Sequence, residues 1–133
     1  MNTIPAASTS LPITPASALP SITTEIDIDG TTQPGFAGTP LSKLLGTSAG
    51  ANANGLTIST GANSSVRGLI IVGFPNKGIQ VNANGVVVAG NYIGTNAAGT
   101  AAPTGTTLQS TGVTVFGSGN KVGGTAAGAG NVI

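Results

Sequence analysis

An internal repeat constrains the fold of this chain more than any other feature. Three copies follow one another: NGLTIS at 54–59 leads to VRGLII at 66–71, KGIQVN at 77–82 to VAGNYI at 88–93, and TGVTVF at 111–116 to KVGG at 121–124. Each copy is too short and too rich in glycine to bury its own apolar face. We therefore expect neighbouring copies to stack and to share one core.

The spacing of the copies predicts how they stack. Gly55 and Gly78 are 23 residues apart, and Val66 and Val88 are 22 apart, a period typical of one turn of a three-sided parallel β-solenoid. Aliphatic residues alternate with polar ones in each copy, so the aliphatic ones should point inward. Asn-Gly steps at 54–55 and 84–85 indicate corners where glycine takes a left-handed conformation. The same step is a strong hairpin signal, so an antiparallel sandwich is the rival interpretation.

The third copy is displaced by an insertion. Gly78 to Gly112 and Val88 to Val122 are both 34 residues, and an equal offset at two anchors indicates added residues between intact copies. The added residues fall in TNAAGTAAPTGTTLQS at 95–110, which is polar and contains small side chains, as a loop at one corner should. We expect a neutral spacer, although such loops are also where scaffolds carry function.

The N-terminal part differs in composition from the repeats. Residues 1–21 hold four of the eight prolines, which predicts an extended lead-in or an N-terminal edge. The segment TEIDIDG at 24–30 alternates isoleucine with aspartate, which predicts a half-buried strand. The segment LSKLLG at 41–46 is compatible with either a short strand or one helical turn. The predicted domain of stacked repeats therefore covers residues 22–133, with the loop insertion at 95–110.

Composition excludes several classes of function. Charged residues make up 5% of the chain, against about 25% in an ordinary soluble domain, and its four cations are scattered, so no nucleic-acid footprint is present. With no Cys and no His, disulfides, zinc sites and thiol chemistry are excluded. We expect no metal and no cofactor. No apolar run reaches the roughly 20 residues of a membrane span, and the first residues do not resemble a signal peptide.

A resemblance to a known family supports the predicted architecture. NYIGTNAAGTAAPTG at 91–105, NKVGGTAAGAGNVI at 120–133 and IDGTTQPGFAGTP at 28–40 resemble the right-handed parallel β-helix repeats of bacterial secreted and cell-surface proteins. The resemblance implies that Asn91 and Asn131 stack at a corner and bond to the backbone of adjacent turns, as amide side chains can. Such proteins usually have more turns, so the apolar end at Val132-Ile133 implies either a fragment or an end covered by a partner or another copy.

Few side chains are candidates for ligand chemistry. Asp27 and Asp29 would share one strand face about 7 Å apart, as an inverting carboxylate pair could, but nothing basic lies near them in sequence. A solvated strand face is the favoured interpretation of both. Arg67 could bind a sugar carboxylate, although a solubilising charge is favoured. Tyr92 could stack on a sugar, although corner packing is favoured. Without His, no serine triad can form, so we expect no enzyme here.

Together these expectations predict one fold and one class of function. The chain should be an all-β, right-handed parallel β-helix of about five or six short turns, in which Gly55, Gly78 and Gly112 mark the corners. Its function should be structural or adhesive, as an exported bacterial surface module at the cell surface or outside the cell, with self-association end to end and cell-surface polysaccharide as candidate partners. The alternative is a carbohydrate-binding or polysaccharide-degrading domain with active residues partly outside this chain. No contact with nucleic acid and no membrane insertion are expected.

Overall fold

The computed structural model describes residues 12–105 and 109–133. Its strands in these ranges are β1 (Asp27–Asp29), β2 (Ser42–Leu45), β3 (Leu56–Ile58), β4 (Ser65–Arg67), β5 (Leu69–Val72), β6 (Lys77–Val81), β7 (Val87–Ala89), β8 (Tyr92–Ile93), β9 (Thr111–Val115) and β10 (Lys121–Val122). The only helix in these ranges is one 3-10 turn, η1 (Gly30–Thr32). All strand pairs are parallel. The prediction of an all-β fold with parallel strands is confirmed, and the antiparallel sandwich is wrong.

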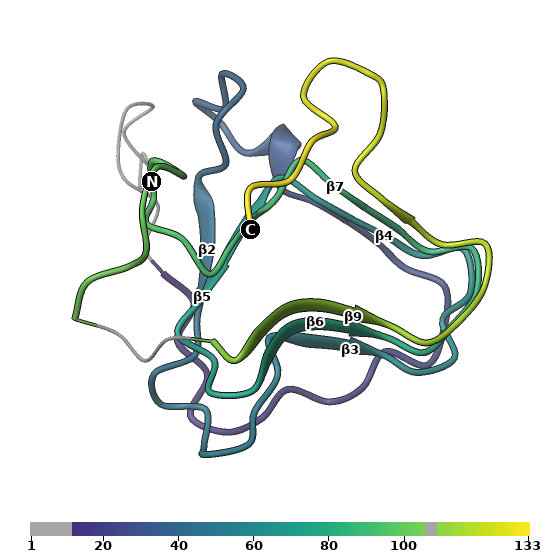
Figure 1. The fold of residues 1–133 in the computed structure, drawn as a ribbon, viewed down its shortest axis with the longest axis horizontal. Coiled ribbons are helices and arrows are strands. Elements are labelled where there is room, and N and C mark those ends of the chain that lie inside the picture. Colours follow the sequence, from purple (N-terminus) through teal and green to yellow (C-terminus); the bar gives the residue numbers. More distant parts are fainter. Residues whose placement is uncertain (1–11, 106–108) are drawn as a thin grey trace, which may run out of the picture.

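Consecutive strands belong to different sheets. The β1 sheet has the order β1-β4-β7-β10, the β2 sheet the order β2-β5-β8, and the β3 sheet the order β3-β6-β9. The chain therefore visits the three sheets in turn and then returns to the first. The sheets lie along three sides of the molecule, and strands of one sheet overlap when the molecule is viewed end on (Figure 1). Segment 41–46, for which the sequence left two alternatives, forms the strand β2.

The core consists of aliphatic side chains aligned from strand to strand. The register columns are Ile28, Val66, Val88 and Val122 in the β1 sheet, Leu44, Ile71 and Ile93 in the β2 sheet, and Ile58, Val81 and Val115 in the β3 sheet. Members from the middle strands, such as Val66 and Val81, are completely buried. Since no single strand could bury these side chains by itself, the strands depend on their neighbours in the stack for stability.

Gly55, Gly78 and Gly112 have a different role from the predicted one. Gly78 and Gly112 lie inside strands, and none of the three has a positive φ, so they do not make corners by left-handed conformation. Instead, a Cβ on Gly78 would lie 2.5 Å from Cγ2 of Ile93 and 2.7 Å from the carbonyl oxygen of Gly112. A Cβ on Gly55 would similarly lie 2.6 Å from Cγ2 of Ile71. These glycines provide space for the isoleucines of the β2 sheet.

Left-handed glycines occur at other positions. Gly85, in the second Asn-Gly step, has φ 70°. The segment 66–71 is divided by Gly68, whose φ of 69° allows the chain to turn between β4 and β5. A side chain would be strained in this conformation, so glycine is required where the β1 sheet leads to the β2 sheet.

The number of levels depends on the sheet. The β1 sheet has four strands, while parallel bridges of Ile13 with Leu44 and of Tyr92 with Val132 extend the β2 sheet by one level at each end. The described residues thus make four to five levels where the repeat length predicted five or six turns. The difference arises from long connections, because Ile28 and Val66 are register partners although 38 residues separate them.

The predicted terminal segment and loop can be located in part. Residues 1–11 of the predicted lead-in lie outside the described residues, while Ile13 and Ile22 form bridges with the β2 and β3 sheets. The insertion at 95–110 connects β8 to β9, and its residues 106–108 also lie outside the described part. Asn96 organises its first half, since its Oδ1 accepts a hydrogen bond from the Thr100 N–H at 2.9 Å and its own N–H donates to the Ala101 carbonyl at 2.9 Å.

Candidate functional site

Asn91 is a completely buried polar side chain that joins two levels of the fold. It follows the left-handed Gly90, just after β7. Its Nδ2 donates to the Val66 carbonyl at 2.9 Å, and its Oδ1 accepts from the Leu69 N–H at 3.0 Å. These two backbone groups lie on either side of the turn at Gly68, where the strand ladder is interrupted. The Asn91 amide therefore replaces the ladder bonds lost at that corner.

Asn131 repeats this arrangement one level further on. Its Nδ2 donates to the Val88 carbonyl at 2.9 Å, and its Oδ1 accepts from the Asn91 N–H at 2.9 Å. The side chains of Asn91 and Asn131 also contact each other directly, with Nδ2 of the former 3.2 Å from Oδ1 of the latter. The two amides thus lie on adjacent levels and extend the chain of hydrogen bonds along the stack.

Sequence analysis missed a third asparagine with the same geometry. Asn120 donates to the Ala83 carbonyl at 3.0 Å and accepts from the Val86 N–H at 2.7 Å, which spans the corner between the β3 and β1 sheets. A signal was available in the sequence, because Asn91, Asn120 and Asn131 all directly follow a glycine. The Gly-Asn step thus accompanies a corner-bridging amide at each of these positions.

Three of the four ligand-binding candidates lie together on the outer face of the β1 sheet. Ser65 is the register partner of Asp27, and Arg67 is the partner of Asp29. The Arg67 Nε lies 4.0 Å from the Asp27 Oδ1, and the Ser65 hydroxyl donates to the same oxygen. Asp27 has no basic neighbour in sequence, as noted above. It does have one in space, because the parallel register brings Arg67 from the next level beside it.

Asp29 has a structural partner of its own. Its Oδ1 accepts hydrogen bonds from the N–H and the hydroxyl of Thr31, and Asp29 thereby caps the N-terminus of the 3-10 turn η1. The Thr31 hydroxyl, then the Thr31 N–H and, more weakly, the positive charge of Arg67 hold the pKa of the Asp29 carboxyl below its usual range. A general acid needs a raised pKa, so Asp29 has the properties of a capping residue rather than of a proton donor.

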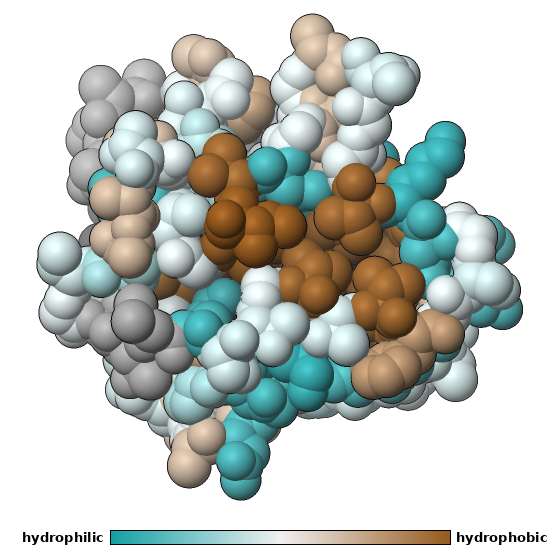
Figure 2. All heavy atoms as spheres, viewed as in Figure 1, coloured by the Kyte–Doolittle hydropathy of each residue, from teal (hydrophilic) through white to brown (hydrophobic). Residues whose placement is uncertain are grey.

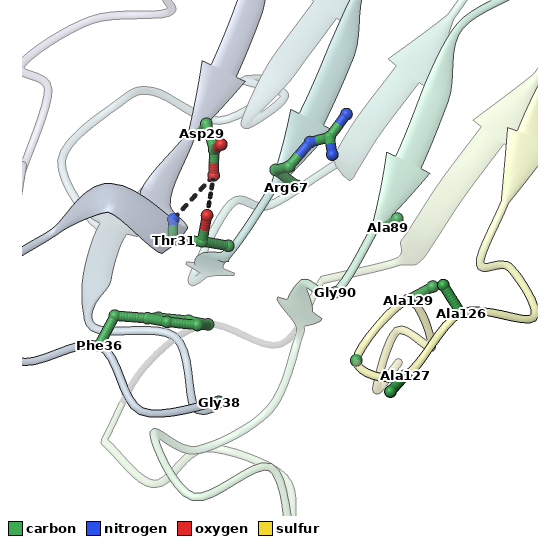
Figure 3. A pocket seen from close by; sticks show the side chains of 11 residues that line it. Asp29, Thr31, Phe36, Gly38, Arg67, Ala89, Gly90, Ala126, Ala127 and Ala129 are labelled. Atoms are coloured by element: carbon green, nitrogen blue, oxygen red, sulfur yellow. Dashed lines mark hydrogen bonds between the residues drawn. The ribbon is translucent and has the colours of Figure 1, made fainter.

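A cleft adjoins these charges where two long connections project from the molecule. Phe36 in the connection from β1 to β2 lies on one side and Ala126–Ala129 in the connection after β10 on the other, while Asp29 and Arg67 lie above (Figure 3). Its volume is about 500 Å³. In the view of Figure 3, the Arg67 guanidinium extends away from the Phe36 ring. Sequence analysis preferred Tyr92 to Phe36 as an aromatic that could stack on a sugar, and nothing local connects Phe36 to the residues some 90 positions further on that form the opposite wall.

Tyr92 is not part of this cleft. It lies in β8 beside the buried Ile93. Its ring packs over Gly99 of the insertion at 95–110, where a Cβ on Gly99 would lie 2.7 Å from a ring carbon. The ring is therefore used for loop packing, and the ligand-binding candidates do not form one site.

Two further findings concern metals and membranes. Among the residues that the structure describes, no group of three or more His, Cys, Asp or Glu side chains is placed to hold a metal ion. Within the same ranges, no helix has the length and apolar character needed to cross a membrane.

Comparison with protein-family models, with curated proteins and with solved structures gave no significant match.

Proposed function

We propose that this chain is a structural or adhesive module: a right-handed parallel β-helix from an exported bacterial surface protein, which extends by stacking end to end. Right-handed connection between parallel strands is the general rule, at about 98% of cases. The three sheets visited in turn and their shared core support a coiled scaffold. The cell-surface location follows only from the resemblance of its repeats to such proteins.

The observation that carries this proposal is the exposed core at the C-terminal end. Val115, Val122 and Ile133 are exposed by 39%, 47% and 63%, although their column neighbours Val81, Val88 and Ile93 are at most 1% exposed. Figure 2 shows the resulting apolar surface at the centre of the end face. The side chains are of the same kind as in the core and lack only a further level above them. An apolar surface next to unpaired strand edges is a surface for strand addition.

Light scattering over a concentration series tests the stacking. We expect the average mass of the purified chain to rise with concentration, because each association event covers an apolar end. A mass that remains that of one chain at the highest soluble concentration would refute self-association. Far-UV circular dichroism in the same samples verifies that the β structure is present.

The cleft supports a second candidate function, binding of a polysaccharide. Phe36 offers an aromatic face and Arg67 a partly exposed guanidinium, and both lie around a hollow large enough for a sugar unit. Against it, the guanidinium does not converge with the ring, and both nearby carboxylates already have partners. We therefore rank it below the structural function.

A panel of acidic and neutral polysaccharides separates the two functions. The structural proposal predicts no reaction product and no binding in the micromolar range by calorimetry. Binding that is lost in both Phe36→Ala and Arg67→Ala, and retained in Lys77→Ala on β6, would instead establish the cleft as a saccharide site.

A further inference from the structure

Among the described residues, the first and the last level of the stack lie on the same side of the molecule. Ile13 bridges to β2 at one end, and Val132 bridges to β8 at the other. The side of the β2 sheet therefore has five levels, while the sides of the β1 and β3 sheets have four each. A second copy placed on the C-terminal end without rotation would put its Ile13 segment where Val132 of the first copy already lies.

A copy that is turned by one side fits this stepped end. Within the chain, the β2 side is followed by the β3 side and then by the β1 side. After Val132, the next free position is therefore on β9, and the Ile13 segment of a turned copy would occupy it. The Ile22 segment of the same copy would then lie on β10, and its β1 on the segment that ends with Ile133. Every position of the stepped end is filled once.

The inward side chains also continue in the turned arrangement. The core residues exposed at the C-terminal end are Val115, Val122 and Ile133. At the other end, each side begins with an isoleucine whose register partner is buried, and these isoleucines are Ile13, Ile22 and Ile28. The turned copy would place Ile13 on Val115, Ile22 on Val122, and Ile28 on Ile133. All three apolar columns would thus be covered by an aliphatic side chain.

The strands at the C-terminal end direct backbone groups toward the added copy. The Phe116 N–H donates to the Val81 carbonyl, so Phe116 faces the previous level. Alternate residues of a parallel strand face opposite neighbours, which leaves the N–H and carbonyl of Val115 directed outward. The Gly123 N–H likewise donates to the previous level, which leaves the backbone groups of Val122 directed outward.

The Ile13 segment offers the matching groups at the other end. The Ile13 N–H donates to the Lys43 carbonyl at 2.8 Å, and the Ile13 carbonyl accepts from the Leu45 N–H at 2.9 Å, so Ile13 faces β2. The Pro12 carbonyl and the Thr14 N–H therefore face the free side. These are the acceptor and the donor that the backbone of Val115 requires. The missing N–H of Pro12 does not interfere, because only its carbonyl is needed.

The Ile22 segment has the same pattern. Both backbone groups of Ile22 bond to the β3 side, since its N–H donates to Thr57 and its carbonyl accepts from Ser59. The Ser21 carbonyl and the Thr23 N–H thus face the free side. They are placed to accept from and donate to an outward-facing strand residue, as Val122 is on β10.

We propose that copies of this chain associate head to tail, with each added copy turned by one side relative to the copy before it. The Ile13 segment of one copy then pairs in parallel with β9 of the other, and its Ile22 segment with β10. This inference rests on the proposed stacking function and names its partner and register. Because the fold has three sides, three successive additions restore the first orientation. The contact is heterologous and does not close, so it produces filaments.

Cysteine pairing tests the register directly, because the natural chain has no cysteine. Pairing of Val115 with Ile13 places Phe116 opposite Thr14, and both of these residues are exposed. Neighbouring parallel strands are about 4.8 Å apart, within the range that a disulfide spans. We expect Phe116→Cys and Thr14→Cys chains to form disulfide-linked heterodimers when they are mixed under mild oxidation, and neither variant to form dimers alone.

Thr23→Cys is the matched control for the rotation. Thr23 is also exposed, and a copy added without rotation would place Thr23 rather than Thr14 opposite Phe116. We therefore expect no disulfide between Phe116→Cys and Thr23→Cys, and its formation would overturn the proposal. Dimers of Phe116→Cys alone would indicate tail-to-tail contact, and dimers of Thr14→Cys alone head-to-head contact. Either of these results would also overturn it.

A proline provides an independent test of the β10 edge. Val122→Pro removes an N–H that faces away from the previous level, so the single chain should keep its circular dichroism spectrum and melting temperature. The concentration required for association should rise at least about tenfold, because a carbonyl of the added copy loses its donor in the contact. Val122→Ala keeps this N–H and should associate more strongly than Val122→Pro.

The outcomes distinguish this inference from the proposed function. If the natural chain associates but Phe116→Cys and Thr14→Cys do not form disulfides with each other, the turned head-to-tail register is wrong and self-association remains. If the natural chain stays monomeric, both are wrong. Association of Val122→Pro as strong as that of the natural chain would remove the β10 edge from the contact and overturn the register.

Discussion

Replacement of Asn91 by alanine should be among the most destabilising single changes in this fold. The Asn91 side chain is completely buried and satisfies the Leu69 N–H and the Val66 carbonyl, which have lost their ladder partners at the Gly68 turn. Alanine would leave both groups without a hydrogen bond in the interior. A buried unsatisfied backbone group costs about 1–3 kcal/mol.

The expected loss follows from these two groups. With water able to reach part of the space that the amide vacates, we expect the free energy of unfolding to fall by about 3 kcal/mol. For a domain of this size, this corresponds to a decrease in melting temperature of roughly 10 °C. Since native domains are stable by about 5–15 kcal/mol, the variant should still fold but unfold at a clearly lower denaturant concentration.

Urea unfolding followed by far-UV circular dichroism measures the effect, at a protein concentration low enough to keep the chain monomeric. Asn82→Ala is the matched control, because Asn82 is exposed and its amide only accepts a hydrogen bond from Gln80, so its change should stay within about 0.5 kcal/mol. Asn120→Ala, at a half-buried corner, should lie between the two. If Asn91→Ala loses no more stability than Asn82→Ala, the amide does not replace the missing ladder bonds and the reasoning fails.

Three further changes test other parts of the fold. Gly78→Ala places a Cβ 2.5 Å from Ile93 and should cost about 1–3 kcal/mol in urea unfolding, while Gly130→Ala, with no atom within 4 Å of its Cβ, should be nearly neutral; equal effects would contradict the packing role of the glycine column. Phe74→Ala removes a completely buried ring that packs against Gly46 and should cost about 3–5 kcal/mol by the same measurement, and a loss below 1 kcal/mol would show that the ring is dispensable. The depressed pKa of Asp29 means that its charged form stabilises the fold above the unfolded value of 3.8 and that this contribution is lost as the pH falls through the folded pKa. Asp29→Asn should therefore have a lower melting temperature than the natural chain at pH 7, with a difference that shrinks below pH 4, and a difference independent of pH would mean that the charge is not responsible.

The candidate site could be predicted only in part. Asp27, Asp29 and Arg67 were recognisable as the residues capable of ligand chemistry, since the chain contains few charges. Their mutual contact was not predictable, because Arg67 follows Asp27 by 40 residues and the turn that leads from β1 to its register partner β4 is longer than the repeat. The cleft beside Phe36 is even less local, because its opposite walls come from connections separated by most of the chain.

That the repeats stack was determined by the sequence, and their period favoured parallel strands over hairpins. Copies 22 and 23 residues apart, each with alternating aliphatic residues, cannot bury their apolar faces individually, so the pattern alone required neighbours in register. Tertiary structure decided the roles of particular residues within that stack. Gly78 was recognisable as a repeated glycine, but only its contact with Ile93 shows that it provides space rather than a turn. The periodicity of the sequence indicates which face of each strand must be buried. Which atoms meet across the core depends on where the other two sheets lie.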